Sequence, residues 1–314
     1  TWEERTNLGS PQRPAGVRPA GEPPAPGGLD PIFRRRRALA ILALVVAVVV
    51  VAALAASGGG NTHKPRPQRP QPHTGLSVPQ RAAAQASAER NAVDRVLSYT
   101  PAITSGGPSG DEVALTFDDG PGPYTQQLVA VLNHYHVHAT FFAIGKEERY
   151  FSAGTIAEIK SADVVADHTE THPMMAALSR RDQENELTEQ IARIELLGGS
   201  RPQLFRPPYG SFSATTLKLL HKLRLLMVLW STDTSDYTLP GTAAIVQSAL
   251  AGAHPGAIIL MHDAGGNRSE TIAALPAIIA GLRKRGLHPV TIPRLMLDDP
   301  PPRGLPIPHS LAGD

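Results

Sequence analysis

The chain has 314 residues, which is enough for one domain with a full hydrophobic core and for accessory segments. Its formal net charge is +2, but residues 1–37 carry +3 (seven Arg against four acids) and residues 57–100 carry +4 (six bases against two acids), which leaves −5 on residues 101–314. The isoelectric point near 9.0 therefore describes the N-terminal segments and does not indicate nucleic acid as a partner. The absence of cysteine excludes disulfides, thiolate metal sites and thiol nucleophiles.

The N-terminal part of the chain contains a long apolar run. Residues 1–37 are rich in Pro, Gly and Arg and predict a disordered, basic cytoplasmic tail. Residues 38–56, "ALAILALVVAVVVVAALAA", are 19 consecutive uncharged apolar residues, which predicts a transmembrane anchor. The basic run at residues 34–37 adjoins the N-terminal end of the anchor, so we expect a single-pass cell-membrane protein with the rest of the chain outside the cytoplasm. A cleaved signal peptide ending near "ALAAS" is the alternative.

A spacer separates the anchor from the remainder of the chain. Residues 57–110 begin with a Gly patch and continue as a Pro-rich stretch, which predicts an extended linker with a short helix at 81–98. Residues 297–314 are again rich in Pro and are predicted to form a C-terminal tail.

Apolar, strand-like runs alternate with longer helix-like segments over residues 111–296. We expect strands at 113–117, 139–144, 163–167, 203–208, 225–230, 257–262 and 288–292, and helices at 124–135, 152–161, 179–197, 213–223, 241–252 and 270–285. This alternation predicts an α/β domain with a parallel sheet, either open or closed into a barrel, and the number of units favours one domain over two.

Ionisable or polar side chains follow five of these predicted strands. They are Asp118 and Asp119, His168 and His172, Arg206 and Tyr209, Asp233 and Asp236, and His262 and Asp263. Each group has an ordinary explanation by itself, such as a turn or a surface residue. Because the carboxyl ends of parallel strands share one edge of a sheet, we interpret the five groups together as one site.

The residue types in this cluster indicate metal-assisted hydrolysis. The cluster lacks a G-x-S-x-G nucleophile and a Gly-rich phosphate loop. Two His and one carboxylate are a typical ligand set of a catalytic zinc site, which keeps positions open for water and substrate. A second carboxylate can serve as general base and a separate His as general acid.

Five short motifs in this order resemble the polysaccharide deacetylase family, the NodB homology domain of carbohydrate esterase family 4. They are "TFDDG" (116–120), "HTETH" (168–172), "RPPYG" (206–210), "DTSDY" (233–237) and "LMH" (260–262), and "ATFFAIG" (139–145) is similar to a core strand of the family. The resemblance implies a distorted (β/α) barrel of about seven strands and removal of N-acetyl or O-acetyl groups from polysaccharides.

The resemblance also implies a role for each matched residue. Asp119, His168 and His172 would bind the metal, and Asp118 would be the catalytic base, oriented by Arg206. His262 would be the general acid with Asp233 as its partner. Tyr209 would offer its backbone N–H to the oxyanion, and Tyr237 and Leu260 would line the substrate site. Tyr237 stands where the family usually has Trp, which retains an aromatic wall.

We therefore expect a divalent metal-dependent deacetylase of an acetylated cell-envelope glycan, with peptidoglycan amino sugars or chitin-like N-acetylglucosamine oligomers as substrates. Two His and one carboxylate suit Zn best, and Co, Ni or Mn also accept these ligands. The alternatives are an O-acetyl esterase of the xylan type and a catalytically silent glycan-binding module. No feature of the sequence indicates an oligomeric state.

Overall fold

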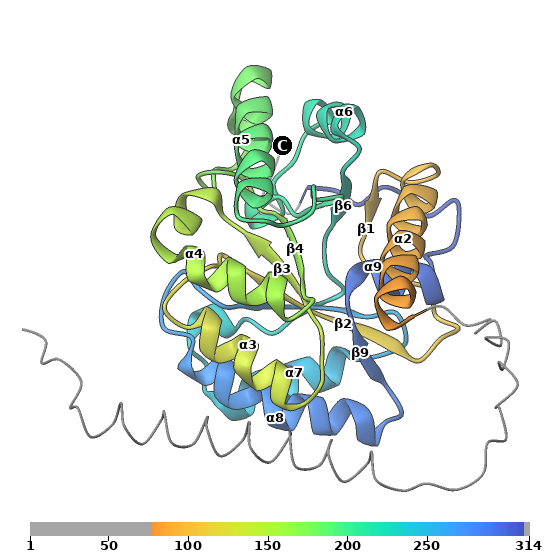
Figure 1. Cartoon of the computed structure of the whole chain (residues 1–314), viewed down its shortest axis with the longest axis vertical. Helices are drawn as coiled ribbons and strands as arrows, with labels where there is room; N and C mark the ends of the chain where they lie inside the picture. Colours follow the sequence, from red (N-terminus) through yellow and green to blue (C-terminus); the bar gives the residue numbers. More distant parts are fainter. Residues whose placement is uncertain (1–76, 311–314) are drawn as a thin grey trace, which may run out of the picture. The chain divides into compact units, whose positions relative to one another are not determined.

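The computed structural model describes residues 77–310 (Figure 1). The predicted basic tail, the predicted anchor at 38–56 and most of the predicted linker lie outside this range. Within residues 77–310, no helix combines the length and the hydrophobicity that a membrane span requires.

The domain is built on a sheet of parallel strands, as the alternating pattern predicted, and this sheet curls into a half-barrel. The sheet of the described residues has nine strands, whereas the resemblance implied about seven. The strand order is β1-β6-β5-β4-β3-β2-β8-β7, and β9 also pairs with β2. In the described part of the chain no strand pairing joins β1 to β7, and an isolated antiparallel bridge between Ser105 and Ala257 links the segment after β1 to the start of β8. The strands are β1 (Ala102–Ile103), β2 (Glu112–Asp118), β3 (Thr140–Ala143), β4 (Val164–Asp167), β5 (Leu204–Phe205), β6 (Leu226–Val228), β7 (Thr232–Asp233), β8 (Ile258–His262) and β9 (His288–Val290).

Helices cover the outside of the curled sheet, and α3, α7 and α8 lie together in Figure 1. The helices are α2 (Val78–Leu97), α3 (Thr125–His134), α4 (Gly145–Lys160), α5 (Arg180–Leu196), α6 (Ala214–Leu223), α7 (Thr242–Gly252), α8 (Ser269–Lys284) and α9 (Ile292–Asp298). Local sequence explains several helix starts. Ser213 caps α6 in a capping box with Thr216, and Ser179 caps α5 through the N–H of Asp182.

Several elements differ from the sequence prediction. β1, β7 and α9 were not predicted, and α4 begins at Gly145 rather than near residue 152, with a non-helical backbone at Phe151. The predicted strand at 203–208 is reduced to Leu204–Phe205, because Pro207 and Pro208 have no N–H to donate to a neighbouring strand.

Segments outside the predicted range 111–296 pack on the same core. Ala92, Val93 and Val96 of α2 are fully buried against residues of β6 and α9. The Tyr99 hydroxyl donates a hydrogen bond to the carbonyl of Pro301 at 2.7 Å. These contacts tie the segment before the domain to the segment after it.

The register of the sheet sets the positions of the polar side chains. Asp118 at the end of β2 is the register partner of His262 at the end of β8. Asp167 at the end of β4 is paired with Phe205 of β5, so His168 and Arg206 follow at the same edge. The residues predicted to form one site therefore leave the sheet at neighbouring strand ends.

Candidate active site

Arg206 is fully buried inside the half-barrel and holds Asp118. Its Nη1 donates to Oδ1 of Asp118 at 2.7 Å and to Oγ1 of Thr116 at 2.9 Å. Its Nε and Nη2 donate to the carbonyls of Val228 (3.0 Å) and Leu229 (3.2 Å). Burial acts to lower the pKa of Arg206, while the charge of Asp118 acts to raise it. Because Oδ1 of Asp118 is engaged, Oδ2 is the oxygen that faces the site, 3.8 Å from Nε2 of His168.

Asp119, His168 and His172 form a group whose possible ligand atoms all lie within 4.8 Å of one another. Oδ1 of Asp119 is 3.1 Å from Nε2 of His172 and 3.6 Å from Nε2 of His168. Burial acts to raise the pKa of Asp119, but the hydrogen bonds with the two imidazoles outweigh it and hold that pKa far below its usual range. The carboxylate is therefore ionised, as a ligand must be.

A short loop after β4 brings the two imidazoles together. The loop is not helical, and both Thr169 (φ 72) and His172 (φ 64) adopt left-handed backbone conformations. The Thr169 N–H donates to Oδ1 of Asp167 at 2.8 Å, and the His172 N–H donates to Oγ1 of Thr169 at 2.9 Å. Nδ1 of His168 bonds the Arg206 carbonyl at 2.7 Å, so its Nε2 points at Asp119.

His262 is paired with Asp236, and not with Asp233 as the sequence analysis expected. Its Nδ1 lies 2.7 Å from Oδ1 of Asp236, and its backbone N–H donates to Oδ2 at 2.9 Å. Thr271 of α8 also donates to Oδ2, at 2.7 Å. A 3₁₀ turn at Asp236–Thr238 directs Asp236 inward, whereas Asp233 is exposed and accepts the N–H of Ser235.

This pairing shifts both pKa values. Burial acts to lower the pKa of His262, but the hydrogen bond and the charge of Asp236 outweigh it, so the pKa of His262 is raised. Burial acts to raise the pKa of Asp236, but the bonds with His262 and Thr271 leave it lowered. The pair therefore favours a protonated imidazole beside an ionised carboxylate.

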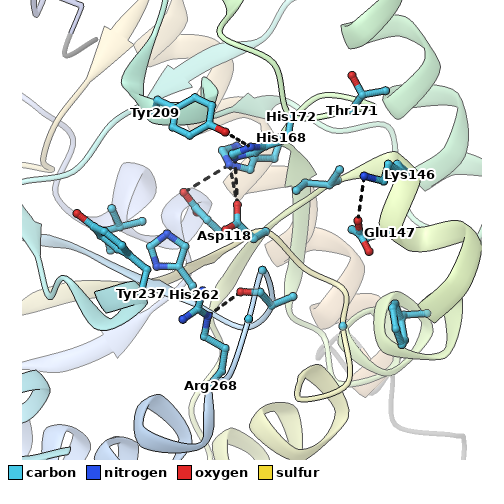
Figure 2. Close-up of a pocket in the computed structure, with 18 of the residues that line it drawn as sticks. Asp118, Lys146, Glu147, His168, Thr171, His172, Tyr209, Tyr237, His262 and Arg268 are labelled. Atoms are coloured by element: carbon cyan, nitrogen blue, oxygen red, sulfur yellow. Dashed lines mark hydrogen bonds and ion pairs between the residues drawn. The ribbon is translucent and has the colours of Figure 1, made fainter. Parts of the chain in front are cut away.

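These groups face one cavity of about 1040 Å³ (Figure 2). Tyr209 and Tyr237 lie on its wall with 58% and 50% of their surface exposed, and Leu260 also lines the cavity. The Tyr237 ring meets the His262 imidazole edge-on with centroids 5.4 Å apart, and the Tyr209 hydroxyl lies 3.2 Å from Nδ1 of His172. Asp118, Asp119, His168, His172, Asp233 and His262 also line the cavity, and Arg206 lies behind it.

Comparison with known proteins identifies the family. The chain is 34% identical over 210 residues to a chitooligosaccharide deacetylase of Sinorhizobium fredii, with 63% of this chain and 98% of that protein covered. The chain belongs to the polysaccharide deacetylase family. The family profile, described as polysaccharide deacetylase, matches residues 105–228.

Two further polysaccharide deacetylases are similar to the chain. A peptidoglycan-N-acetylglucosamine deacetylase of Bacillus cereus is 34% identical over 204 residues, with 64% of this chain and 95% of that protein covered. The crystal structure of the Bc1960 peptidoglycan N-acetylglucosamine deacetylase, in complex with an N-hydroxybenzamide, superimposes with a TM-score of 0.61 at 31% identity, with 64% of this chain and 94% of that chain covered.

The ligand group of this polysaccharide deacetylase fits a divalent ion. Ligand atoms bound at about 2.0–2.2 Å around a tetrahedral ion lie roughly 3.4 Å apart. The observed separations of 3.1 and 3.6 Å between Asp119 and the two imidazoles are close to that value. The hydrogen bond from Nδ1 of His168 to a carbonyl oxygen fixes the tautomer that leaves Nε2 available, as is usual for a metal-binding imidazole.

Asp263 supports the β2 end of the deacetylase site from behind. Its backbone N–H donates to the Asp118 carbonyl at 3.2 Å, and its carboxyl accepts a hydrogen bond from the Thr125 hydroxyl. Burial raises the pKa of Asp263 to about 7. A Cβ at Gly120 would lie 2.2 Å from Oδ2 of Asp263, so only glycine allows this approach.

Sequence reasoning assigned no role to Lys146, Glu147 and Arg268, which also line the cavity of the deacetylase. Each of the three follows a strand: Lys146 and Glu147 come after β3, and Arg268 comes after β8. Their position just beyond a strand end was the signal available, but they are not part of the five motifs. Asp236 was within a motif, and its distance from His262 depends on a turn that the motif does not specify.

Proposed function

We propose that this polysaccharide deacetylase removes N-acetyl groups from amino sugars of a cell-envelope glycan, with peptidoglycan as the first candidate. The proposal rests on three sets of side chains that meet at one cavity. They are the pair of Asp118 and Arg206, the group of Asp119 with two imidazoles, and the pair of His262 and Asp236. Two of the relatives, a peptidoglycan-N-acetylglucosamine deacetylase and a chitooligosaccharide deacetylase, support the same class of substrate.

Asp119, His168 and His172 are the residues that would hold the metal. A divalent ion held there, for which we propose Zn²⁺ ahead of Co²⁺, Ni²⁺ or Mn²⁺, would supply Lewis-acid chemistry: it would lower the pKa of a water and polarise the acetyl carbonyl. Oδ2 of Asp118, which is free of Arg206, then accepts the proton of the attacking water. Arg206 keeps that carboxylate from rotating, because Arg206 is itself bonded to Thr116 and to two backbone carbonyls.

His262 acts after the water has added to the carbonyl. With Nδ1 bonded to Asp236, its Nε2 is the nitrogen available to the cavity. An amine is a poor leaving group unless it is protonated, and the protonated imidazole of His262 supplies that proton. We propose that the backbone N–H of Tyr209 stabilises the oxyanion, a contact that contributes roughly 3 to 4 kcal/mol in other enzymes.

We propose that the domain works outside the cytoplasm, held to the cell membrane by residues 38–56. The 19-residue apolar run and the basic cluster at 34–37 support this placement. The Pro-rich stretch before α2 would then give the catalytic domain reach toward the cell wall.

Acetate release from N-acetylglucosamine oligomers and from purified peptidoglycan tests the proposal. The full chain, supplied with Zn²⁺, is expected to release acetate from at least one of the two, and a chelator is expected to abolish the release. Acetate from acetylated xylan alone would instead identify an O-acetyl esterase. Glycan binding that is unchanged in Asp118→Asn, with no acetate from any substrate, would identify a silent module.

A further inference from the structure

Arg268 is a second buried guanidinium at the catalytic cavity. It lies in the loop between β8 and α8, lines the cavity, and is 3% exposed. Its Nε donates to the Ala264 carbonyl at 2.6 Å and its Nη1 to the Asn267 carbonyl at 3.2 Å. Figure 2 shows the guanidinium below His262 in that view, with Lys146 and Glu147 on another wall.

Within residues 77–310, Arg268 forms no ion pair, whereas the other buried arginine of the site, Arg206, is paired with Asp118 at 2.7 Å. Two carbonyl oxygens solvate part of the guanidinium but carry no net charge. A buried cation without a counterion is costly, so this one points to an anion that arrives with the ligand.

One nitrogen of Arg268 is left for such a ligand. Nη2 makes no hydrogen bond with a residue of the described range. Gly266 (φ +149) also lines the cavity, and a Cβ built on it would lie 3.4 Å from Nη2. Because glycine has no side chain, the approach to Nη2 past residue 266 is open.

The same loop touches the reacting centre. It begins directly after His262, and a Cβ at Gly265 would lie 2.6 Å from Oδ2 of Asp119. An anion bound by Arg268 would share the cavity with the acetamido group that is attacked, and a substituent on the same sugar is the simplest source of such an anion. Neutral N-acetylglucosamine carries no such group.

We propose that Arg268 binds a carboxylate on the reacting sugar, so that the enzyme selects N-acetyl amino sugars that carry an acidic ether substituent beside the acetamido group, as the lactyl group of N-acetylmuramic acid does. This proposal rests on the deacetylase function proposed above and names the substrate within it. Arginine is suited to this role because its planar fork matches a carboxylate.

A matched pair of substrates tests the proposal: a glycan oligomer containing N-acetylmuramic acid with a free lactyl carboxylate, and the same oligomer with that carboxylate converted to its methylamide. The full chain with Zn²⁺ is expected to deacetylate the free acid with a kcat/KM about ten- to a hundred-fold higher, the range of one hydrogen bond between charged groups. Arg268→Gln is expected to bring this ratio close to one, and Arg268→Lys to give an intermediate ratio.

Lys146→Gln is the control, because it removes a positive charge from the same cavity while leaving Arg268 in place. Its ratio of free acid to methylamide is expected to stay near that of the unaltered chain. Equal rates on the two oligomers in the unaltered chain would overturn the proposal, even if Arg268→Gln fails to fold. A fall in the ratio in Lys146→Gln as large as in Arg268→Gln would also overturn it. Absence of acetate from every glycan would instead contradict the deacetylase function itself.

Discussion

Replacing Asp236 with Asn tests the assignment of His262 as the general acid. Asp236 is fully buried and makes two contacts with His262, at 2.7 Å to Nδ1 and at 2.9 Å to the backbone N–H. Asparagine preserves the shape but removes the charge that favours the imidazolium. A hydrogen bond to a charged group contributes about 1.5–3 kcal/mol, so we expect kcat to fall about ten- to a hundred-fold at neutral pH.

The pH profile gives a second, independent reading of the same change. Asp236 raises the pKa of His262, so the proton that the leaving amine needs is retained to higher pH. In Asp236→Asn that pKa is lowered, and the decline of kcat on the alkaline side is expected to begin at lower pH. Acetate release measured over a pH series, with circular dichroism to check folding, detects both effects.

Asp233→Asn is the matched control, since Asp233 lies in the same motif but is exposed and bonds only the Ser235 N–H among the described residues. We expect the alkaline decline of kcat in Asp233→Asn to coincide with that of the unaltered chain. If Asp233→Asn shifted this alkaline decline and Asp236→Asn did not, Asp236 would not be the residue that controls the protonation of His262 during catalysis.

The remaining predictions concern metal binding and stability. Gly265→Ala is expected to weaken Zn²⁺ binding measured by calorimetry, because the added Cβ would press on Asp119. The control is Gly286→Ala, which is also at positive φ but has no atom within 4 Å of the added Cβ. It should lower the stability of the fold without lowering the affinity for Zn²⁺. Burial raises the pKa of Asp163 to about 7. The unfolded chain releases this proton at about pH 4, so the free energy of unfolding should decrease as the pH rises from about 4 to about 7. Asp163→Asn should flatten that fall in urea titrations, whereas Asp111→Asn at an exposed position should not; an unchanged slope would contradict the assignment.

The parallel sheet and the clustering of the motifs followed from the sequence because both depend on local pattern. Alternating apolar runs specify strands and helices, and parallel strands place their carboxyl ends together whatever the detailed curvature. Asp118, Asp119, His168, His172, Arg206 and His262 therefore meet in the structure as expected. Their catalytic roles stay predictions until the variants are assayed.

The features that sequence reasoning missed depend on contacts between distant segments. β1 and β7 are two-residue strands that exist because β6 and β8 offer them backbone partners. The inward direction of Asp236 depends on the 3₁₀ turn and on Thr271, 35 residues later in the chain. Arg268 is distinguished by its burial, and it lies in none of the five motifs that marked the other site residues.

The buried arginine at the centre of the half-barrel links folding to catalysis. Arg206 lies over the Phe142 ring at 4.1 Å, and its guanidinium is hydrogen-bonded to groups of β2 and β6. Removing the carboxylate of Asp118 would leave this charge without a counterion in the core, and breaking a buried pair costs about 3–5 kcal/mol. A chain that loses this proposed catalytic base by mutation is therefore also expected to be less stable as a folded protein. In a variant that lacks the carboxylate of Asp118, a second substitution of Arg206 by an uncharged residue should therefore restore part of the lost stability but not the activity.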